Sequence, residues 1–173
     1  AIITCTLTTR LKDHAKMSAQ AAFRTKILFD TNQLLQRAKN EEEILSQTAS
    51  QLMKLLNRSL IVYPEQNGDL GSEQLFSVDG ESAQNIFSAP EERDAANWTF
   101  ANKKRSGAGT DSYQDAKGLY LALRTGGGVF GVIGIDLSEK PLDAFENSVL
   151  LSILGEGALA IENRRNALEK EQA

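Results

Sequence analysis

The sequence predicts a single α+β domain with a long helix at each end. Apolar residues repeat at helical spacing in the first third of the chain and again beyond Pro141. Between these parts lie compact β-prone runs separated by glycine-containing turns, which indicate antiparallel strands. A length of 173 residues fits one domain of ordinary size with a sizeable core. A second full domain is not expected.

The first residues predict the cytoplasmic end of a membrane helix. An apolar run from Ala1 to Leu7 is followed by the basic residues Arg10, Lys12 and Lys16. The run is too short to span a bilayer, which needs roughly 20 apolar residues. An apolar stretch followed by lysine and arginine is nevertheless typical of the cytoplasmic side of a transmembrane helix. We expect residues 1–12 to be this end and its juxtamembrane segment; an amphipathic helix of a soluble protein is the alternative.

Two helices are predicted next. Residues 13–39 contain neither proline nor glycine, and their apolar positions fall on one helical face, so this segment is expected to be a long signalling helix. Asn40 with Glu43 three residues later forms a plausible N-cap and capping pair. A second helix should therefore start there and run to about Asn57.

The pattern then changes to that of strands. Residues 60–63 form a β-prone run that we expect to end at Pro64, and Asn67-Gly68 is a turn signal before another extended segment that ends near Val78. A hairpin is the simplest interpretation. A polar loop is expected from there to about Ser88.

A short helix is predicted from a capping box at Ser88, with proline in the first turn, as far as Ala101. The strongest strand signals follow at residues 118–124 and 129–135. The glycines of residues 125–128 between them suit a hairpin turn, because glycine readily adopts positive φ. A phosphate-binding loop would instead need lysine, serine or threonine and a helix at that point. After Pro141 the helical period returns and continues into a charged tail.

Composition excludes several classes of function. A net charge of −4 gives no broad basic field, so a nucleic-acid partner is not expected. The single cysteine, Cys5, cannot form an internal disulfide or build a zinc or iron–sulfur site, which agrees with a reducing, cytosolic setting. No serine nucleophile elbow or paired-carboxylate hydrolase site is present, so catalysis by this segment is not expected.

Three stretches together carry a resemblance to a known family. Residues 7–12, the run 92–100 with the following 106–111, and residues 119–124 resemble the GAF region of the Kdp potassium-sensor histidine kinases. The resemblance covers nearly the whole chain. Its most specific part is a tryptophan-containing helix, a Gly-Thr-Asp loop and a Leu-Tyr-Leu-x-Leu-Arg strand in that order.

The resemblance implies a GAF-like antiparallel sheet covered by helices, with long N- and C-terminal helices forming a dimer stalk. Residues 40–160 would be the GAF sensory domain, and residues 141–173 would form a C-terminal helix leading to the kinase dimerisation region. The parent would be a homodimeric integral membrane kinase, anchored upstream of residue 1, with this domain on the cytoplasmic face of the membrane. It would use ATP and Mg and phosphorylate a response regulator. This segment would contain no catalytic residue, cofactor or metal.

The resemblance also bears on chemistry that the segment lacks. His14, the only histidine, is followed by Ala15-Lys16-Met17 and not by the acidic residue and Leu-Arg-x-Pro-like run of a phosphoacceptor. Bilin-binding GAF domains need a cysteine inside the domain, and GAF-type methionine sulfoxide reductases need several. We therefore expect the histidine chemistry to belong to another part of the parent.

A ligand pocket is the first candidate site. Basic residues precede the glycine-rich loop after the tryptophan helix, so backbone donors and charge there would suit a small anionic or polar ligand. The alternatives are that Asp111 only caps the loop, that Trp98 belongs to the core, and that Arg124 pairs with an acidic residue at the sheet edge. The candidate pocket residues are Trp98, Arg105, Gly107, Gly109, Thr110, Asp111, Tyr120 and Arg124.

Signal relay through helices is the second candidate. Its mechanism would be a change in helix rotation, register or splay. The candidate relay or dimer residues are apolar positions of the terminal helices, namely Leu28, Leu35, Val149, Ile153 and Ile161. Intramolecular packing would produce the same spacing. Gly155 and Gly157 inside the last helix suggest a close helix approach.

The leading hypothesis is therefore a non-catalytic sensory and relay domain of a two-component sensor histidine kinase that controls potassium uptake. The alternative is a small-ligand-binding GAF module of a soluble transcriptional regulator. An upstream transmembrane segment would distinguish the two.

Overall fold

The computed structural model describes residues 2–172, with the surroundings of side chains 11–171. Its centre is an antiparallel sheet with the strand order β2-β1-β6-β5-β4, to which β3 adds beside β1. The strands are β1 Leu60–Gln66, β2 Asp69–Leu70, β3 Gln74–Phe76, β4 Ser106–Gly107, β5 Gly118–Thr125 and β6 Gly128–Asp136. The helices are α1 Ile2–Gln36, α2 Glu41–Leu56, α3 Ser82–Phe87, α4 Pro90–Asn102 and α5 Ala144–Gln172.

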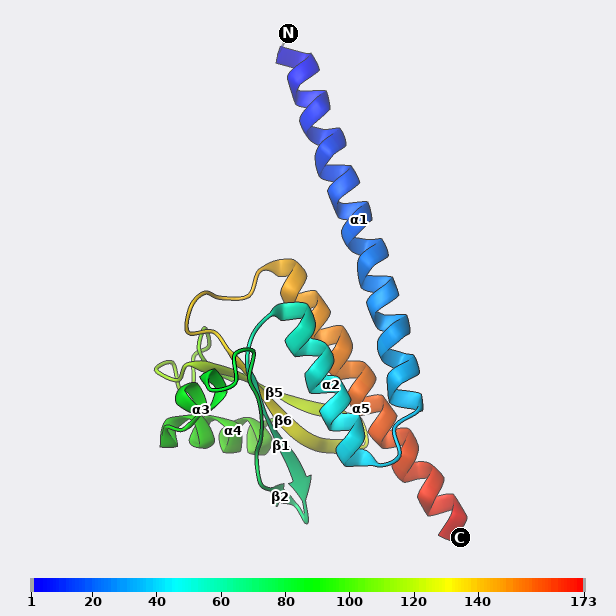
Figure 1. Cartoon of the computed structure of the whole chain (residues 1–173), viewed down its shortest axis with the longest axis vertical. Coiled ribbons are helices and arrows are strands. Elements are labelled where there is room, and N and C mark those ends of the chain that lie inside the picture. Colours follow the sequence, from blue (N-terminus) through cyan, green and yellow to red (C-terminus); the bar gives the residue numbers. More distant parts are fainter. Residues whose placement is uncertain (1, 173) are drawn as a thin grey trace.

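Helices cover both faces of the sheet (Figure 1). The long helices α1, α2 and α5 share one apolar core with one face, whereas the short helices α3 and α4 pack on the other. Strand alternation explains this division, because successive side chains of a strand point to opposite faces. In β1, for example, Leu60 and Val62 join the core of the long helices, while Ile61 and Tyr63 join that of the short helices.

The two terminal helices give the molecule its long axis (Figure 1). Helices α1 and α5 run in the same direction and contact each other, whereas α2 runs in the opposite direction and packs against both, and the ends labelled N and C lie at opposite extremes. The described residues 11–19 are all exposed, so the first part of α1 projects beyond the domain. Helix α1 runs without a break from Ile2 to Gln36. Of the expected membrane end, residues 1–12, the side chains of residues 1–10 lie outside the described ones.

The cap of α2 is as predicted. The side chain of Asn40 accepts a hydrogen bond from the Glu43 backbone N–H at 2.8 Å, and the helix ends at Asn57 in a left-handed conformation with φ 52°. The Glu43 carboxylate accepts from the backbone N–H of Lys39 at 2.7 Å, one residue before the expected position. Local polar bonds therefore fix where the chain turns from α1 into α2.

Strand β1 does not end at Pro64, so that prediction is wrong. The strand continues to Gln66, and Pro64 pairs with Gly131 of β6. The Pro64 carbonyl accepts from the Gly71 N–H at 2.7 Å on the outer side of β1. Because the N and C=O of one residue point to the same edge of a strand, the missing N–H of proline falls on that outer side, where an edge position tolerates it.

The expected polar loop before residue 88 contains the short helix α3, which the sequence analysis missed. Its first turn is held by Asp79, whose carboxylate accepts from the Ser82 N–H at 2.8 Å. Ser88 is the C-cap of α3, and it therefore does not cap α4. Helix α4 instead starts after Ala89, with Pro90 in its first turn, where a missing N–H costs nothing.

The predicted central hairpin is confirmed, with β5 and β6 paired from Gly118–Asp136 to Thr125–Gly128. The predicted close helix approach is confirmed for Gly157, where an added Cβ would lie 2.6 Å from the Thr48 Oγ1 atom of α2. Gly155 faces open space and makes no such approach. The two glycines of α5 therefore differ, although they are two residues apart.

Candidate functional site

The eight predicted pocket residues are spread over the short-helix face and its rim. Tyr120 is fully buried, and Gly107 pairs with Leu119 at the adjoining edge of the sheet. Arg124 is exposed four residues further along β5, which is about 13 Å from Tyr120 at the usual strand rise. The structure thus brings Tyr120 and Gly107 together and leaves Arg124 apart from them.

The other members of the set have local roles. Trp98 is half-buried on α4, while Gly109 and Asp111 are exposed in the loop. The Thr110 hydroxyl donates to the carbonyl oxygens of Gly107 and Ser112, at 2.8 Å in each case, which closes the loop on itself. Arg105 is exposed and donates to the Asn147 side chain of α5 at 3.2 Å. That these residues line a ligand pocket remains a prediction.

A buried carboxylate that sequence analysis missed lies at the centre of this face. Glu92 of α4 is only 1% exposed. Its oxygens accept from the backbone N–H groups of Lys117 at 2.5 Å and Gly118 at 3.2 and 3.3 Å, and from the Tyr120 hydroxyl at 2.8 Å. A charge removed from water needs such donors, because an unpaired buried charge is strongly unfavourable.

Aromatic side chains fill the rest of this face. Burial, together with the charge of Glu92, raises the pKa of Tyr120, and burial with the charge of Glu73 raises the pKa of Tyr63, so both phenols stay protonated. The rim has two hollows, of about 230 and 260 Å³. Both are smaller than the roughly 300–1,000 Å³ of ordinary ligand pockets.

A signal for Glu92 was present in the sequence. Glu92, Ala95, Ala96 and Thr99 follow each other at helical spacing and are all buried on α4. Glutamate in a helical first turn is usually assigned to a favourable interaction with the helix dipole. Its place on the buried stripe of α4 was therefore the informative feature, although the donors come from another part of the chain.

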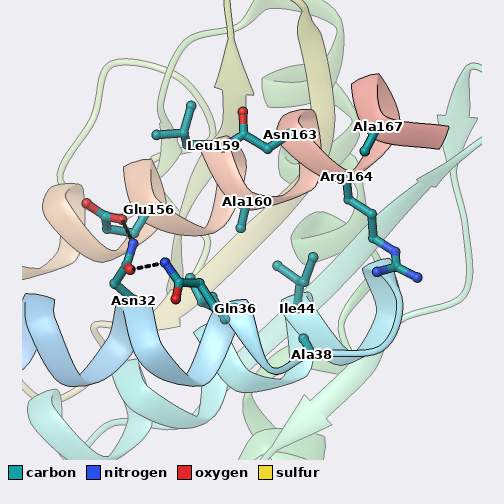
Figure 2. A pocket seen from close by; sticks show the side chains of 11 residues that line it. Asn32, Gln36, Ala38, Ile44, Glu156, Leu159, Ala160, Asn163, Arg164 and Ala167 are labelled. Atoms are coloured by element: carbon teal, nitrogen blue, oxygen red, sulfur yellow. Dashed lines mark hydrogen bonds between the residues drawn. The ribbon is translucent and has the colours of Figure 1, made fainter. Parts of the chain in front are cut away.

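The second candidate site is the outer face of α1 and α5. A groove of about 320 Å³ lies between the end of α1 and α5, and its lining includes Leu159 and Asn163. Figure 2 shows the Asn32 side chain of α1 beside Gln36 and Glu156. The Asn32 amide donates to the Glu156 carboxylate at 3.1 Å, and the Gln36 amide donates to the Asn32 side chain at 2.9 Å. The wall of the groove is therefore polar where α1 is hydrogen-bonded to α5.

The two helices are held in a defined parallel register. Arg24 donates to Ser148 at 2.7 Å, and Asn32 donates to Glu156. Each pair is separated by 124 residues in the chain, so the same offset holds over two turns. A rotation or translation of α1 relative to α5 would break both bonds.

The predicted relay residues lie on the inner side of these helices. Leu35, Val149, Ile153 and Ile161 are buried in the core, and Leu28 packs partly buried against it. Their spacing is thus explained by intramolecular packing, and any role between copies remains a prediction. The large apolar residues that α1 and α5 expose are others: Leu11, Met17, Phe23, Phe29, Leu151, Leu159 and Leu168.

Arginines fix both ends of α5. Before its start, the guanidinium of the 6%-exposed Arg58 donates to the carbonyl oxygens of Asp136, Lys140 and Pro141 at 2.7–3.1 Å. Near its end, Arg165 donates to Glu41 at 2.7 and 3.0 Å and to Glu65 at 3.1 Å. The start is therefore held by a buried group and the end by partly exposed ion pairs.

Neither a metal centre nor a clear membrane span emerges from the described residues. Within them, no group of three or more histidine, cysteine, aspartate or glutamate residues is placed to hold a metal ion. Helix α5 is long and apolar enough to cross a membrane by length and composition alone, but its buried face packs on the sheet, as in a core helix.

Comparison with known proteins gives a sequence relative that matches nearly the whole chain. The sensor protein KdpD of Clostridium acetobutylicum is 31% identical over 173 residues, which cover 99% of this chain. The chain spans only 19% of that protein's length. No model of a known protein family matches the chain.

Solved structures agree on the fold. The GAF domain of the potassium sensor histidine kinase KdpD from Escherichia coli superimposes with a TM-score of 0.64 at 18% identity, over 86% of this chain and 99% of that one. The GAF domain of a phosphoenolpyruvate-protein phosphotransferase from Acinetobacter gives a TM-score of 0.58 at 10% identity, over 83% and 95% of the two chains. At such low identity these likenesses show the fold alone.

Proposed function

We propose that this chain, a KdpD-like GAF domain by sequence and by fold, is a sensory and signal-relay domain of a two-component sensor histidine kinase that controls potassium uptake. The domain would lie on the cytoplasmic face of the membrane in an integral membrane parent. It would perform no catalysis itself. The parent would use ATP and Mg and would phosphorylate a response regulator.

One observation carries this proposal: α1 and α5 run parallel, in one register, and lead to opposite ends of the molecule (Figure 1). A displacement of α1 thereby has a direct mechanical path to α5. Helix α2 packs against both helices, and the sheet supports α5. Two packings that differ by a small free energy are enough to shift a kinase equilibrium, because the ratio of states changes tenfold for about 1.4 kcal/mol.

The relay would operate in a homodimer whose contact is the outer face of α1 and α5. Phe29, Leu151 and Leu159 of these two helices are 62%, 46% and 48% exposed, and a patch of such side chains would mark an interaction surface. The groove in Figure 2 lies beside Leu159. Neighbouring helices of a second copy would cover these residues and continue the coiled-coil-like geometry of a stalk.

The alternative, a ligand-binding module of a soluble regulator, requires an open cavity inside the domain. The side chains of Glu92, Tyr63 and Tyr120 occupy the face that should provide it. This observation favours relay over ligand binding.

The decisive experiment inserts alanines into α5 after the exposed residue Asn166 in the full-length parent kinase. One, two, three, four and seven residues would be inserted, since each adds about 100° of helical rotation. Relay through α5 predicts that autophosphorylation varies with the helical phase and that the seven-residue insertion retains it. Equal activity for all insertions contradicts the proposal.

The dimer contact is tested by light scattering of the chain across concentration. We expect Leu159→Glu, and removal of residues 1–26, to weaken dimerisation. Leu75→Glu is the matched control, because Leu75 is 44% exposed on β3, away from the stalk. A monomer in every case would assign dimer affinity to other parts of the parent.

A further inference from the structure

The three groups that hold Glu92 form a preorganised cradle for a carboxylate. The donors are the N–H groups of Lys117 and Gly118 and the hydroxyl of Tyr120, and between them they make four contacts of 2.5–3.3 Å to the two oxygens. All of the donors are neutral. Among the described residues no lysine or arginine forms an ion pair with Glu92. Recognition in the cradle thus rests on directed hydrogen bonds.

The sheet positions this cradle independently of α4. Gly118 pairs with Asp136, and Tyr120 pairs with Gly134 of β6 and with Ser106 of β4. Gly134 lies beneath the Tyr120 ring, where its missing side chain leaves the room that the ring occupies. Gly118 and Tyr120 are consequently held by strand pairing whether or not a side chain from α4 reaches them.

We propose that this cradle is a carboxylate-binding site that the chain fills with its own Glu92, and that it takes a small free carboxylate when this side chain is removed. The site deepens the proposed function and rests on it: a domain whose internal site is self-occupied receives its signal through the stalk helices. Free carboxylates would leave the native domain unaffected.

Size and access favour acetate as the probe. Replacing glutamate by alanine removes four heavy atoms, Cγ, Cδ and two oxygens, and acetate consists of one methyl carbon and the same carboxylate. The hollow of about 230 Å³ lined by Glu92, Asp115 and Lys117 leads to the cradle from the rim. A molecule of acetate can therefore reach the vacated position without opening the core.

The test compares Glu92→Ala with Glu91→Ala in thermal unfolding of the chain, with sodium acetate and with sodium chloride at equal ionic strength. Glu91 is the exposed neighbour on the same turn and also lines this hollow, so its variant controls for helix propensity, charge and a wider entrance. We expect Glu92→Ala to have a lowered Tm that acetate restores in a saturable way, with Kd on the order of 10 mM, as suits a ligand of four heavy atoms. Formate should bind, whereas propionate should bind less well because the vacated space ends at Cβ.

Further outcomes decide the proposal. If Glu92→Ala is unfolded, recovery of its circular dichroism by acetate replaces the Tm as the readout. Glu92→Gln fills the site and should fold without any response to acetate. Equal effects of acetate on the wild type, Glu91→Ala and Glu92→Ala would overturn the proposal, as would a folded Glu92→Ala whose Gly118 amide resonance does not shift with acetate. Neither result would alter the insertion experiment, so failure here is distinct from failure of the relay.

Discussion

The two faces of the sheet bury different kinds of side chain. The face under α1, α2 and α5 is covered by aliphatic side chains, with Ile133, Leu150 and Ile153 fully buried. The face under α3 and α4 buries a carboxylate, hydroxyls and two phenols, among them Glu92 and Tyr120. Apolar packing is non-directional, whereas a buried polar network holds only in one geometry.

This difference separates two roles within one domain. An apolar layer between long helices contains few directed bonds, which suits the relay that we propose. The polar layer ties α4 to the start of β5 through Glu92, which gives that side one fixed arrangement. The long-helix face is thus suited to movement and the short-helix face to support.

The largest effect should come from the centre of the apolar face. Ile153→Ala removes a side chain that is 0% exposed, so we expect unfolding free energy to fall by about 2–5 kcal/mol through lost burial and the cavity left behind. Leu75→Ala, on β3 away from the proposed dimer contact and 44% exposed, should change it by less than about 0.5 kcal/mol. Urea denaturation measures both, and similar losses would contradict the exposure of Leu75 in the structure.

The two glycines of α5 offer a test with opposite signs. At Gly157 a Cβ would lie 2.6 Å from the Thr48 Oγ1 atom, so Gly157→Ala should destabilise the domain by about 1–3 kcal/mol through overpacking. Gly155→Ala meets no atom within 4 Å and should stabilise it by about 1 kcal/mol through helix propensity. A gain in stability for both variants would show that α2 and α5 are further apart than in the structure.

The buried tyrosines of the short-helix face should make the domain less stable at alkaline pH. Burial raises the pKa of Tyr63 and Tyr120 above the ordinary value near 10, so these phenols ionise in the unfolded chain before they do in the folded one. Their contribution to the free energy of unfolding is fully present below pH 10. It decreases as the pH rises, by about 1.4 kcal/mol per pH unit for each tyrosine. Tyr63→Phe should lessen this slope in urea titrations between pH 10 and 11. An unchanged slope would mean that other groups cause the loss.

The smallest effect is expected at the end of α5. Arg165→Gln breaks the ion pairs with Glu41 and Glu65, but these groups are partly exposed, so the loss should be about 0.2–1 kcal/mol. In about 1 M salt the difference in unfolding free energy from the wild type should become smaller, because the Debye screening length is then only roughly 3 Å. The neighbour Arg164, on the groove side of α5, supplies the control Arg164→Gln. Salt-independent loss would indicate that stacking of Arg165 on Phe130, at 4.8 Å, matters more than charge.

Much of the fold was predictable because its signals are local. The cap at Asn40 and the glycine-rich turn between β5 and β6 depend on a few adjacent residues, and both lie where the sequence places them. Errors arose where two local signals competed. Ser88 resembles an N-cap, but the preceding helix α3 uses it as its C-cap. Pro64 resembles a strand end, but its missing N–H falls on the outer side of β1.

The candidate site was less predictable, because it depends on contacts between distant residues. The sequence by itself determined the order of the elements, the long terminal helices, the apolar stripes and, through family resemblance, the GAF fold. Only the tertiary structure decided that Glu92 meets donors 25 to 28 residues further along the chain, and that α1 and α5 lie parallel at an offset of 124 residues. The physical reason is that a helical or strand period fixes which side of an element is apolar, whereas the partner of that side is chosen by packing of the whole chain.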